Sequence, residues 1–183
     1  MAEVKGKFIS LACSLIQTKP DALQAAINAV QKMTGSDYRD LNPEGWYDTK
    51  VFDAVFSALE EHSSPILAWA AIKVIGLRVY PTIEATVGLP KHFKSPLDFV
   101  VFEAEGFLAN HRGPDVIPRK FLKSEEGHVI VDAPSPGYNC ALIEGVFEGI
   151  LQMCGVRNGR VVQTKCKKKG DRTCVYDITW KPQ

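Results

Sequence analysis

The chain has 183 residues, of which 45% are hydrophobic and 23% are charged, and its net charge is +1. This length corresponds to one ordinary domain that buries enough surface to fold without disulfides or metal. The near-neutral charge gives no indication of binding to nucleic acid or to an acidic membrane. We therefore expect a single globular domain over residues 1–183 that has no nucleic-acid partner.

The number of cysteines and the length of the apolar runs indicate in which cellular compartment the protein resides. Five cysteines are an odd number, and residues 8–16 form a short apolar stretch that no small-residue cleavage site follows. The sequence therefore favours free thiols or a metal site in a cytoplasmic protein over a disulfide framework. The longest apolar run, residues 66–75, is interrupted by Lys73 and is shorter than the roughly 18 residues that cross a bilayer, so we expect no membrane span.

Apolar residues at helical spacing predict that residues 1–115 are mainly helical. Proline and serine or aspartate at the expected first turns mark where helices begin. Residues 66–79 are apolar nearly all round, which predicts a central buried helix that Pro81 kinks or ends. The expected helices are residues 5–19, stopped by Thr18 and Lys19, then 20–34, a helix capped by Asp48 or Thr49 that runs to Leu59, then 66–79, a short one over 82–87, and 96–108.

The pattern changes to alternation in residues 116–183. Residues 118–123 and 128–131 alternate around a turn at 124–127, and residues 160–167 and 173–180 do so around 168–171. Residues 140–154 lie between these two hairpins and have helical spacing, with Gly145 and Gly149 suited to close packing against the sheet. The sequence thus predicts an α+β fold, in which N-terminal helices pack on a four-stranded antiparallel sheet made of two hairpins with an intervening helix.

Three cysteines are the sharpest chemical feature. Cys140, Cys166 and Cys174 have the spacing Cys-x25-Cys-x7-Cys, and the last two flank one tight turn. Cys140 begins the helix before this hairpin, so three thiolates can converge on a zinc ion, whereas Cys154 lies roughly 21 Å further along the helix. Three buried thiols without metal, or a Cys166–Cys174 bond formed on oxidation, remain open as alternatives.

The fourth zinc ligand and any catalytic group are less clear. Candidates for the fourth ligand are Gln163, Glu144 and Asp171. No nucleophile constellation, dinucleotide loop or phosphate loop occurs, which indicates a protein without catalysis of its own. His111 follows the phenylalanine-rich helix, where it is either a haem ligand or a cation at the helix end.

Aromatic residues are frequent in the helical part. Most of them must lie in the core, but if the helices splay from the sheet they would instead line a cavity for an apolar ligand. The residues that we expect to contact such a ligand are Trp69, Phe99, Phe102 and Phe107.

Residues 137–180 resemble the 4-vinyl reductase domain family. The likeness lies in Tyr-Asn-Cys-Ala from Tyr138, Gly-Val-Phe-Glu-Gly from Gly145, Thr-Lys-Cys from Thr164 and Gly-Asp-Arg-Thr-Cys-Val-Tyr from Gly170. The resemblance implies a fold related to haem–nitric-oxide-binding domains and to phenol-sensor domains, and a cavity for a small, mostly apolar molecule. In the phenol sensors three cysteines bind zinc with a nearby glutamate, and this chain has Cys140, Cys166 and Cys174, with Gln163 in the place of the glutamate.

The same resemblance argues against haem. The haem-binding relatives carry Tyr-x-Ser-x-Arg before the helix, whereas this chain has Ala133, Ser135 and Gly137 at the three positions. We therefore expect a structural zinc and no haem as cofactors.

Three functions follow from these observations. The leading hypothesis is a non-catalytic sensor or carrier domain for an apolar or aromatic molecule, with a signalling protein as a potential partner and a homodimer as a potential assembly. The second is a protein interaction or scaffold domain with a filled cavity. The third is an accessory protein or reductase in tetrapyrrole (bacteriochlorophyll vinyl) metabolism, although no nicotinamide or flavin motif is visible.

Overall fold

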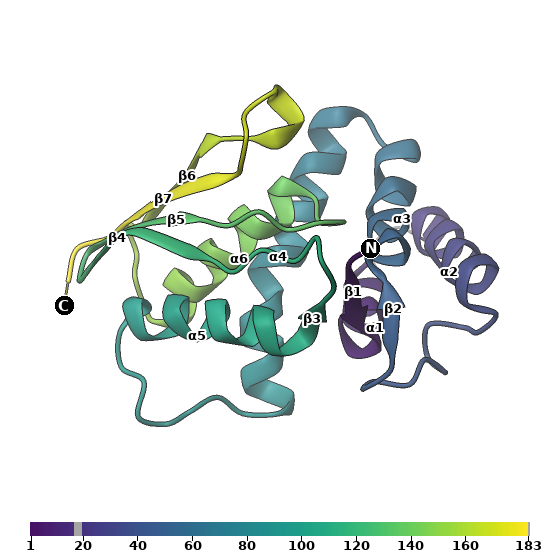
Figure 1. The fold of residues 1–183 in the computed structure, drawn as a ribbon, viewed down its shortest axis with the longest axis horizontal. Helices are drawn as coiled ribbons and strands as arrows, with labels where there is room; N and C mark the ends of the chain where they lie inside the picture. The colour runs from purple at the N-terminus through teal and green to yellow at the C-terminus, as the bar shows by residue number, and fades with distance from the viewer. Residues whose placement is uncertain (17–19, 183) are drawn as a thin grey trace.

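The protein folds into two groups of elements on either side of a pair of long helices, α4 and α6 (Figure 1). The computed structural model describes residues 1–16 and 20–182. The helices are α1 (Gly6–Leu15), α2 (Pro20–Thr34), α3 (Thr49–Glu61), α4 (Pro65–Thr86), α5 (Pro96–Asn110) and α6 (Cys140–Met153), with a short 3-10 helix at Lys167–Lys169. The strands are β1 (Glu3–Lys5), β2 (Trp46–Asp48), β3 (His111–Arg112), β4 (Lys120–Glu125), β5 (His128–Asp132), β6 (Arg160–Lys165) and β7 (Val175–Thr179).

The main sheet consists of the four strands of the two predicted hairpins. Its strand order is β4-β5-β7-β6, all neighbours are antiparallel, and α6 lies in sequence between its two hairpins. The predicted α+β fold is confirmed. A second sheet of order β2-β1-β3 was not predicted, because strands of two or three residues are too short to show alternation.

Helix starts follow the side chains that cap them. Ser95 and Asp98 form a reciprocal capping box around Pro96, and Asp48 accepts a hydrogen bond from the Lys50 amide at the start of α3. The predicted stop of the first helix at Thr18 and Lys19 lies outside the described residues.

Helix α4 differs from its prediction in two ways. It continues through Pro81 to Thr86, and its outer face is open, with Ile66, Leu67 and Val74 exposed, so it is not buried all round. Among the described residues it is the one helix that is long and apolar enough to cross a membrane, and 28% of its most apolar window is buried. A long core helix of a globular protein has the same length and composition, and the other face of α4 packs on α6.

Glycines set the close approach of α4 and α6. A Cβ atom on Gly145 would overlap the Lys73 carbonyl oxygen, and one on Gly149 would lie 2.5 Å from that of Leu77. A Cβ atom on Gly76 of α4 would likewise overlap the carbonyl oxygen of Leu142 on α6. The two α6 glycines therefore pack against α4, not against the sheet as their spacing had suggested. This seam separates a core built on α1, α2 and α3 from a core built on the sheet, α5 and α6.

Candidate ligand cavity and cysteine cluster

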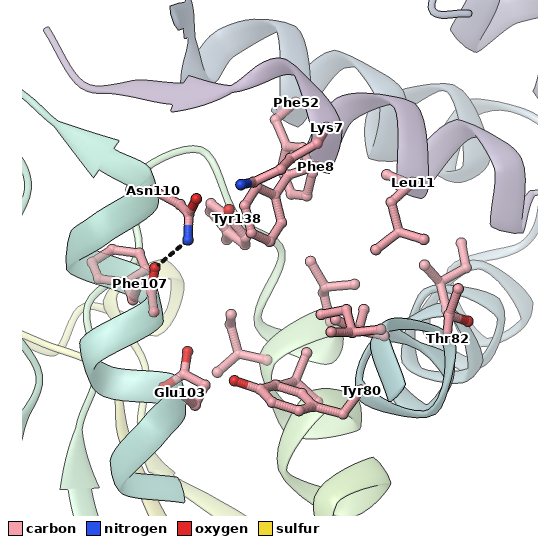
Figure 2. A pocket seen from close by; sticks show the side chains of 18 of the residues that line it. Lys7, Phe8, Leu11, Phe52, Tyr80, Thr82, Glu103, Phe107, Asn110 and Tyr138 are labelled. Carbon is pink, nitrogen blue, oxygen red and sulfur yellow. Dashed lines mark hydrogen bonds between the residues drawn. The ribbon is translucent and has the colours of Figure 1, made fainter. Parts of the chain in front are cut away.

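A cavity of about 400 Å³ lies between α1, α4, α5 and α6 (Figure 2). Its volume falls within the range of ligand pockets, roughly 300–1,000 Å³. Most of its wall is apolar, and the side chains that form this part include Phe8, Leu11, Leu15, Phe52, Ile75, Val79, Ile83, Phe102, Phe107, Leu142, Ile143 and Val146.

Two of the four aromatic residues expected at a ligand site line this cavity. They are Phe102 and Phe107, both on α5. Phe99 instead packs edge-on against Phe93 at 5.4 Å between ring centroids. Trp69 is 47% exposed on the outer part of α4, where its ring lies 4.9 Å from the Lys73 ammonium nitrogen.

A buried ion pair in the cavity wall escaped the sequence analysis. Glu103 of α5 faces Arg119, which immediately precedes β4, and the carboxylate oxygens lie 2.8 Å from Nη2 and 3.3 Å from Nε of the guanidinium. Arg119 also donates to the Pro134 carbonyl and to the Ser135 hydroxyl, and its guanidinium lies 3.8 Å from the centre of the Phe107 ring. The one available signal was a glutamate on the apolar face of a predicted helix, since ionised residues are rarely buried without a partner.

His111 forms one end of the cavity. Its Nδ1 lies 2.7 Å from the Phe107 carbonyl oxygen and its Nε2 lies 2.5 Å from the Tyr138 hydroxyl, and its ring stacks on Phe107. Burial, together with the nearby positive charge of Arg119, lowers the pKa of His111 to about 4. The ring is therefore neutral at physiological pH and does not act as a helix-end cation. Its Nδ1–H donates to the carbonyl, which leaves Nε2 as the acceptor of the Tyr138 proton.

Two tyrosine hydroxyls complete the polar part of the wall. Burial raises the pKa of Tyr138 and, together with the negative charge of Glu103, raises that of Tyr80 well above its ordinary value. Both groups are therefore neutral donors. Among residues 1–16 and 20–182, the Tyr80 hydroxyl has no hydrogen-bond partner, and it points across the cavity toward Glu103 (Figure 2).

The three predicted cysteines converge where α6 begins beside the β6–β7 hairpin. The Sγ atoms of Cys140 and Cys166 are 3.6 Å apart, and all three sulfurs lie within 4.8 Å of one another. Tetrahedral zinc with Zn–S bonds of about 2.3 Å places its sulfurs about 3.8 Å apart, so this geometry suits a shared ion. All five cysteines are free, and Cys154 lies outside the cluster.

Hydrogen bonds hold the cluster in place. The Cys166 amide donates to the Asp171 carboxylate at 2.7 Å, which closes the turn that contains Lys167–Lys169. A hydrogen bond from Cys140 lowers the pKa of Cys174 to about 7, and the same bond raises the pKa of Cys140. The Lys167 amide also donates to Cys174. One thiolate is thus already favoured in this arrangement.

The candidates for a fourth metal ligand are now distinguished. Glu144 is paired with Lys73 at 2.7 Å, and Asp171 is used by the Cys166 amide. The Gln163 side chain hydrogen-bonds Cys140, and its Nε2 donates to the Tyr176 hydroxyl at 3.3 Å. Of the three residues, Gln163 is therefore the one whose side chain contacts a cysteine sulfur.

Comparison with known proteins identifies the fold. No family model matches the sequence, and no curated protein does either. Among solved structures, a mutant H-NOX protein from K. algicida in the Fe(II) unliganded form has a TM-score of 0.71 and 13% identity, over 98% of this chain and 97% of that one. An H-NOX domain from Shewanella oneidensis, solved by NMR in the Fe(II)CO state, has a TM-score of 0.68 and 13% identity, over 98% and 99%.

A third structure comes from a study of haem distortion in the H-NOX family, with a TM-score of 0.69 and 12% identity over 96% of this chain and 93% of that one. These neighbours correct the expectation that haem is excluded, because they are haem proteins that share this fold over almost their whole length. The expectation rested on a tyrosine and an arginine that are both missing before α6, where the chain has Ala133 and Gly137, yet Arg119 reaches Ser135 from another segment. The 4-vinyl reductase resemblance gains no support of its own, whereas the implied relation to haem–nitric-oxide-binding domains is confirmed as a likeness of fold: the chain has the fold of H-NOX domains.

Proposed function

We propose that this protein is a non-catalytic small-molecule sensor or carrier domain, and that its ligand occupies the cavity between α1, α4, α5 and α6. The observation that carries the proposal is the cavity itself, about 400 Å³ of mostly apolar wall with a few convergent polar groups. The H-NOX neighbours support a sensor role through their shared fold, which is an argument by analogy. The ligand is a small, mostly apolar molecule.

Haem is the second candidate ligand, and His111 favours it. A metal-binding histidine usually donates one ring N–H to a carbonyl and offers the other nitrogen to the metal. His111 donates from Nδ1 to the Phe107 carbonyl, is neutral, and lines the cavity. Nε2 would have to exchange the Tyr138 hydroxyl for iron. In that case Arg119 and Ser135 would hold the haem carboxylates only by giving up the hydrogen bonds that they now make with Glu103, with Pro134 and with each other.

We further propose that Cys140, Cys166 and Cys174 hold a structural zinc ion, with Gln163 or water beside the fourth position. The sulfur separations and the preference of zinc for thiolates support this assignment. The resemblance of residues 137–180 to the phenol sensors points the same way. The ion would tie the β6–β7 hairpin to the first turn of α6.

The experiment that tests the cavity uses a variant that fills it. Gly106 lines the cavity, and a Cβ atom built there meets nothing within 4 Å. Gly106→Leu should therefore fill the space without disturbing the fold, and Ala109→Leu on the exposed side of the same helix is the matched control. Binding of haem is followed by the Soret band, and binding of naphthalene by calorimetry.

Binding of either probe to the native chain and to Ala109→Leu, with at least a tenfold loss in Gly106→Leu, is the expected result. A Soret band that His111→Ala removes identifies haem as the ligand. If neither probe binds, or if Gly106→Leu binds as well as the control, the cavity is not a ligand site. An interaction or scaffold role would then replace this proposal.

A further inference from the structure

The ion pair in the cavity wall is almost closed to solvent. The side chains of Arg119 and Glu103 are 1% and 10% exposed. Four of the five guanidinium N–H groups are used, because Nε and one N–H of Nη2 donate to Glu103 while Nη1 donates to Pro134 and Ser135. The protein thus occupies nearly all hydrogen-bond donors of Arg119, and one N–H group is left for a ligand.

Glu103 is in the opposite situation. Each of its carboxylate oxygens accepts one hydrogen bond from Arg119, and a carboxylate oxygen can accept a second. The residue lines the cavity, so these remaining acceptor positions lie where a ligand would sit. An ionised carboxylate has no proton to give, and it therefore selects for a donor.

Tyr80 supplies the complementary group. It is 7% exposed, it comes from α4 on another wall of the cavity, and its hydroxyl is directed toward Glu103 (Figure 2). The two groups make no hydrogen bond with each other among the contacts of the described residues, so a gap separates the Tyr80 hydroxyl from the acceptor positions that Glu103 has left. A hydroxyl group suits this gap, because it donates to a carboxylate and accepts from a phenol at once.

The energetic cost of the ion pair supports a role for it beyond stability. Buried ion pairs can often be replaced by apolar residues of similar volume at no cost, since desolvation offsets the attraction between the charges. Here the pair is buried in the wall of a mostly apolar cavity, so stability alone does not require it. A recognition role for Glu103 accounts for its presence.

We infer that Glu103 is the specificity-determining residue of the cavity: it accepts a hydrogen bond from a hydroxyl group of the ligand, while Tyr80 donates to the same oxygen. The ligand is then an uncharged, hydroxyl-bearing molecule with an apolar frame, and a carboxylic acid in its place would face the like charge of Glu103. This inference rests on the proposed function and names the chemistry that the cavity selects.

The test compares ligands of one frame that differ in their polar group. The probes are 2-naphthol, 2-methoxynaphthalene, which accepts but cannot donate, and 2-naphthoate, and their dissociation constants are measured by calorimetry at pH 7. Hydrogen bonds to charged groups correspond to roughly 10-fold to 100-fold in affinity. We expect 2-naphthol to bind at least about tenfold more tightly than 2-methoxynaphthalene.

The variants assign this preference to residues. Glu103→Gln should reduce the ratio of the two affinities to within about threefold, because a neutral amide oxygen is a weaker acceptor. Since this change leaves Arg119 without its counter-ion, the double variant Glu103→Gln with Arg119→Gln provides a pair without charge. Tyr80→Phe should weaken 2-naphthol and 2-methoxynaphthalene alike, because the Tyr80 hydroxyl donates to the oxygen of both, and it should leave the ratio of the two affinities unchanged.

The outcomes separate the inference from the proposed function. Equal binding of all three probes, or an unchanged ratio in both Glu103 variants, overturns the role of Glu103 and leaves the cavity a ligand site. Tightest binding by 2-naphthoate overturns it as well and makes Arg119 the recognising group. If no probe binds and haem does not bind either, the proposed function fails and the inference fails with it.

Discussion

The cavity and the cysteine cluster depend on opposite kinds of sequence information. The cluster joins three residues between Cys140 and Cys174, and one hairpin turn brings two of them together. The cavity wall draws residues from Lys7 to Val146, so four helices must be placed before it exists. A short-range pattern therefore reveals a site directly, whereas a long-range one becomes visible only in the folded chain.

The largest expected effect comes from the contact between α4 and α6, because α6 contributes residues to both sites. Gly145→Ala should lower the free energy of unfolding by about 3 kcal/mol, because the new methyl group would meet the Lys73 carbonyl oxygen and force α4 away from α6. Urea unfolding followed by circular dichroism gives the value. Gly106→Ala is the matched control on α5, and it should stabilise by about 0.5–1 kcal/mol, since nothing lies within 4 Å. Equal effects of the two substitutions would contradict the close contact between α4 and α6.

Stabilisation by zinc should depend on the cysteine cluster and not on the cavity. At free zinc one hundred times its dissociation constant, the native chain should gain about 2.7 kcal/mol in unfolding free energy. Cys174→Ser should abolish this gain, while Cys154→Ser, outside the cluster, should retain it. Thermal unfolding with and without zinc, alongside metal analysis of the purified protein, measures both. A gain that survives Cys174→Ser would place the ion elsewhere, and no gain in the native chain would leave the cluster as three free thiols.

The elements that the sequence predicted well are those with local causes. Ser95 with Pro96, and Asp48, marked helix starts through hydrogen bonds to the next few residues, and both hairpins followed from alternation around turns. The end of α4 could not be placed from Pro81, because the helix continues through this residue to Thr86 and ends where the Val87 amide donates to the Ile83 carbonyl. The Glu103–Arg119 pair was likewise invisible, since its two residues come from a helix and from the segment before a strand.

Acidification should act on the cavity through His111. Its ordinary pKa is 6.5 and burial lowers the value in the folded chain to about 4, so between these limits the unfolded chain binds more protons. The stabilisation is complete above pH 6.5 and is lost as the pH falls toward 4, which corresponds to about 2 kcal/mol between pH 7 and pH 5.

Urea unfolding at several pH values tests this effect. His111→Phe removes the titrating group, so the comparison uses the slope of stability against pH rather than the absolute values. The native chain should lose stability more steeply than the variant in this window. Identical slopes would show that the ring is accessible to protons in the folded chain, in which case Nε2 is not held by Tyr138 as the structure places it.

The smallest expected change in stability concerns Trp69. The sequence could not show which aromatic residues line the cavity and which lie outside it. Trp69→Ala should lower stability by less than about 1 kcal/mol, because its ring contacts Lys73 at a half-exposed position. It should also leave naphthalene affinity within about twofold of the native value. Phe102→Ala, which opens the cavity wall, should weaken that affinity about tenfold, the equivalent of 1.4 kcal/mol. If Trp69→Ala weakened binding as much as Phe102→Ala, the ligand would lie on the outer face of α4.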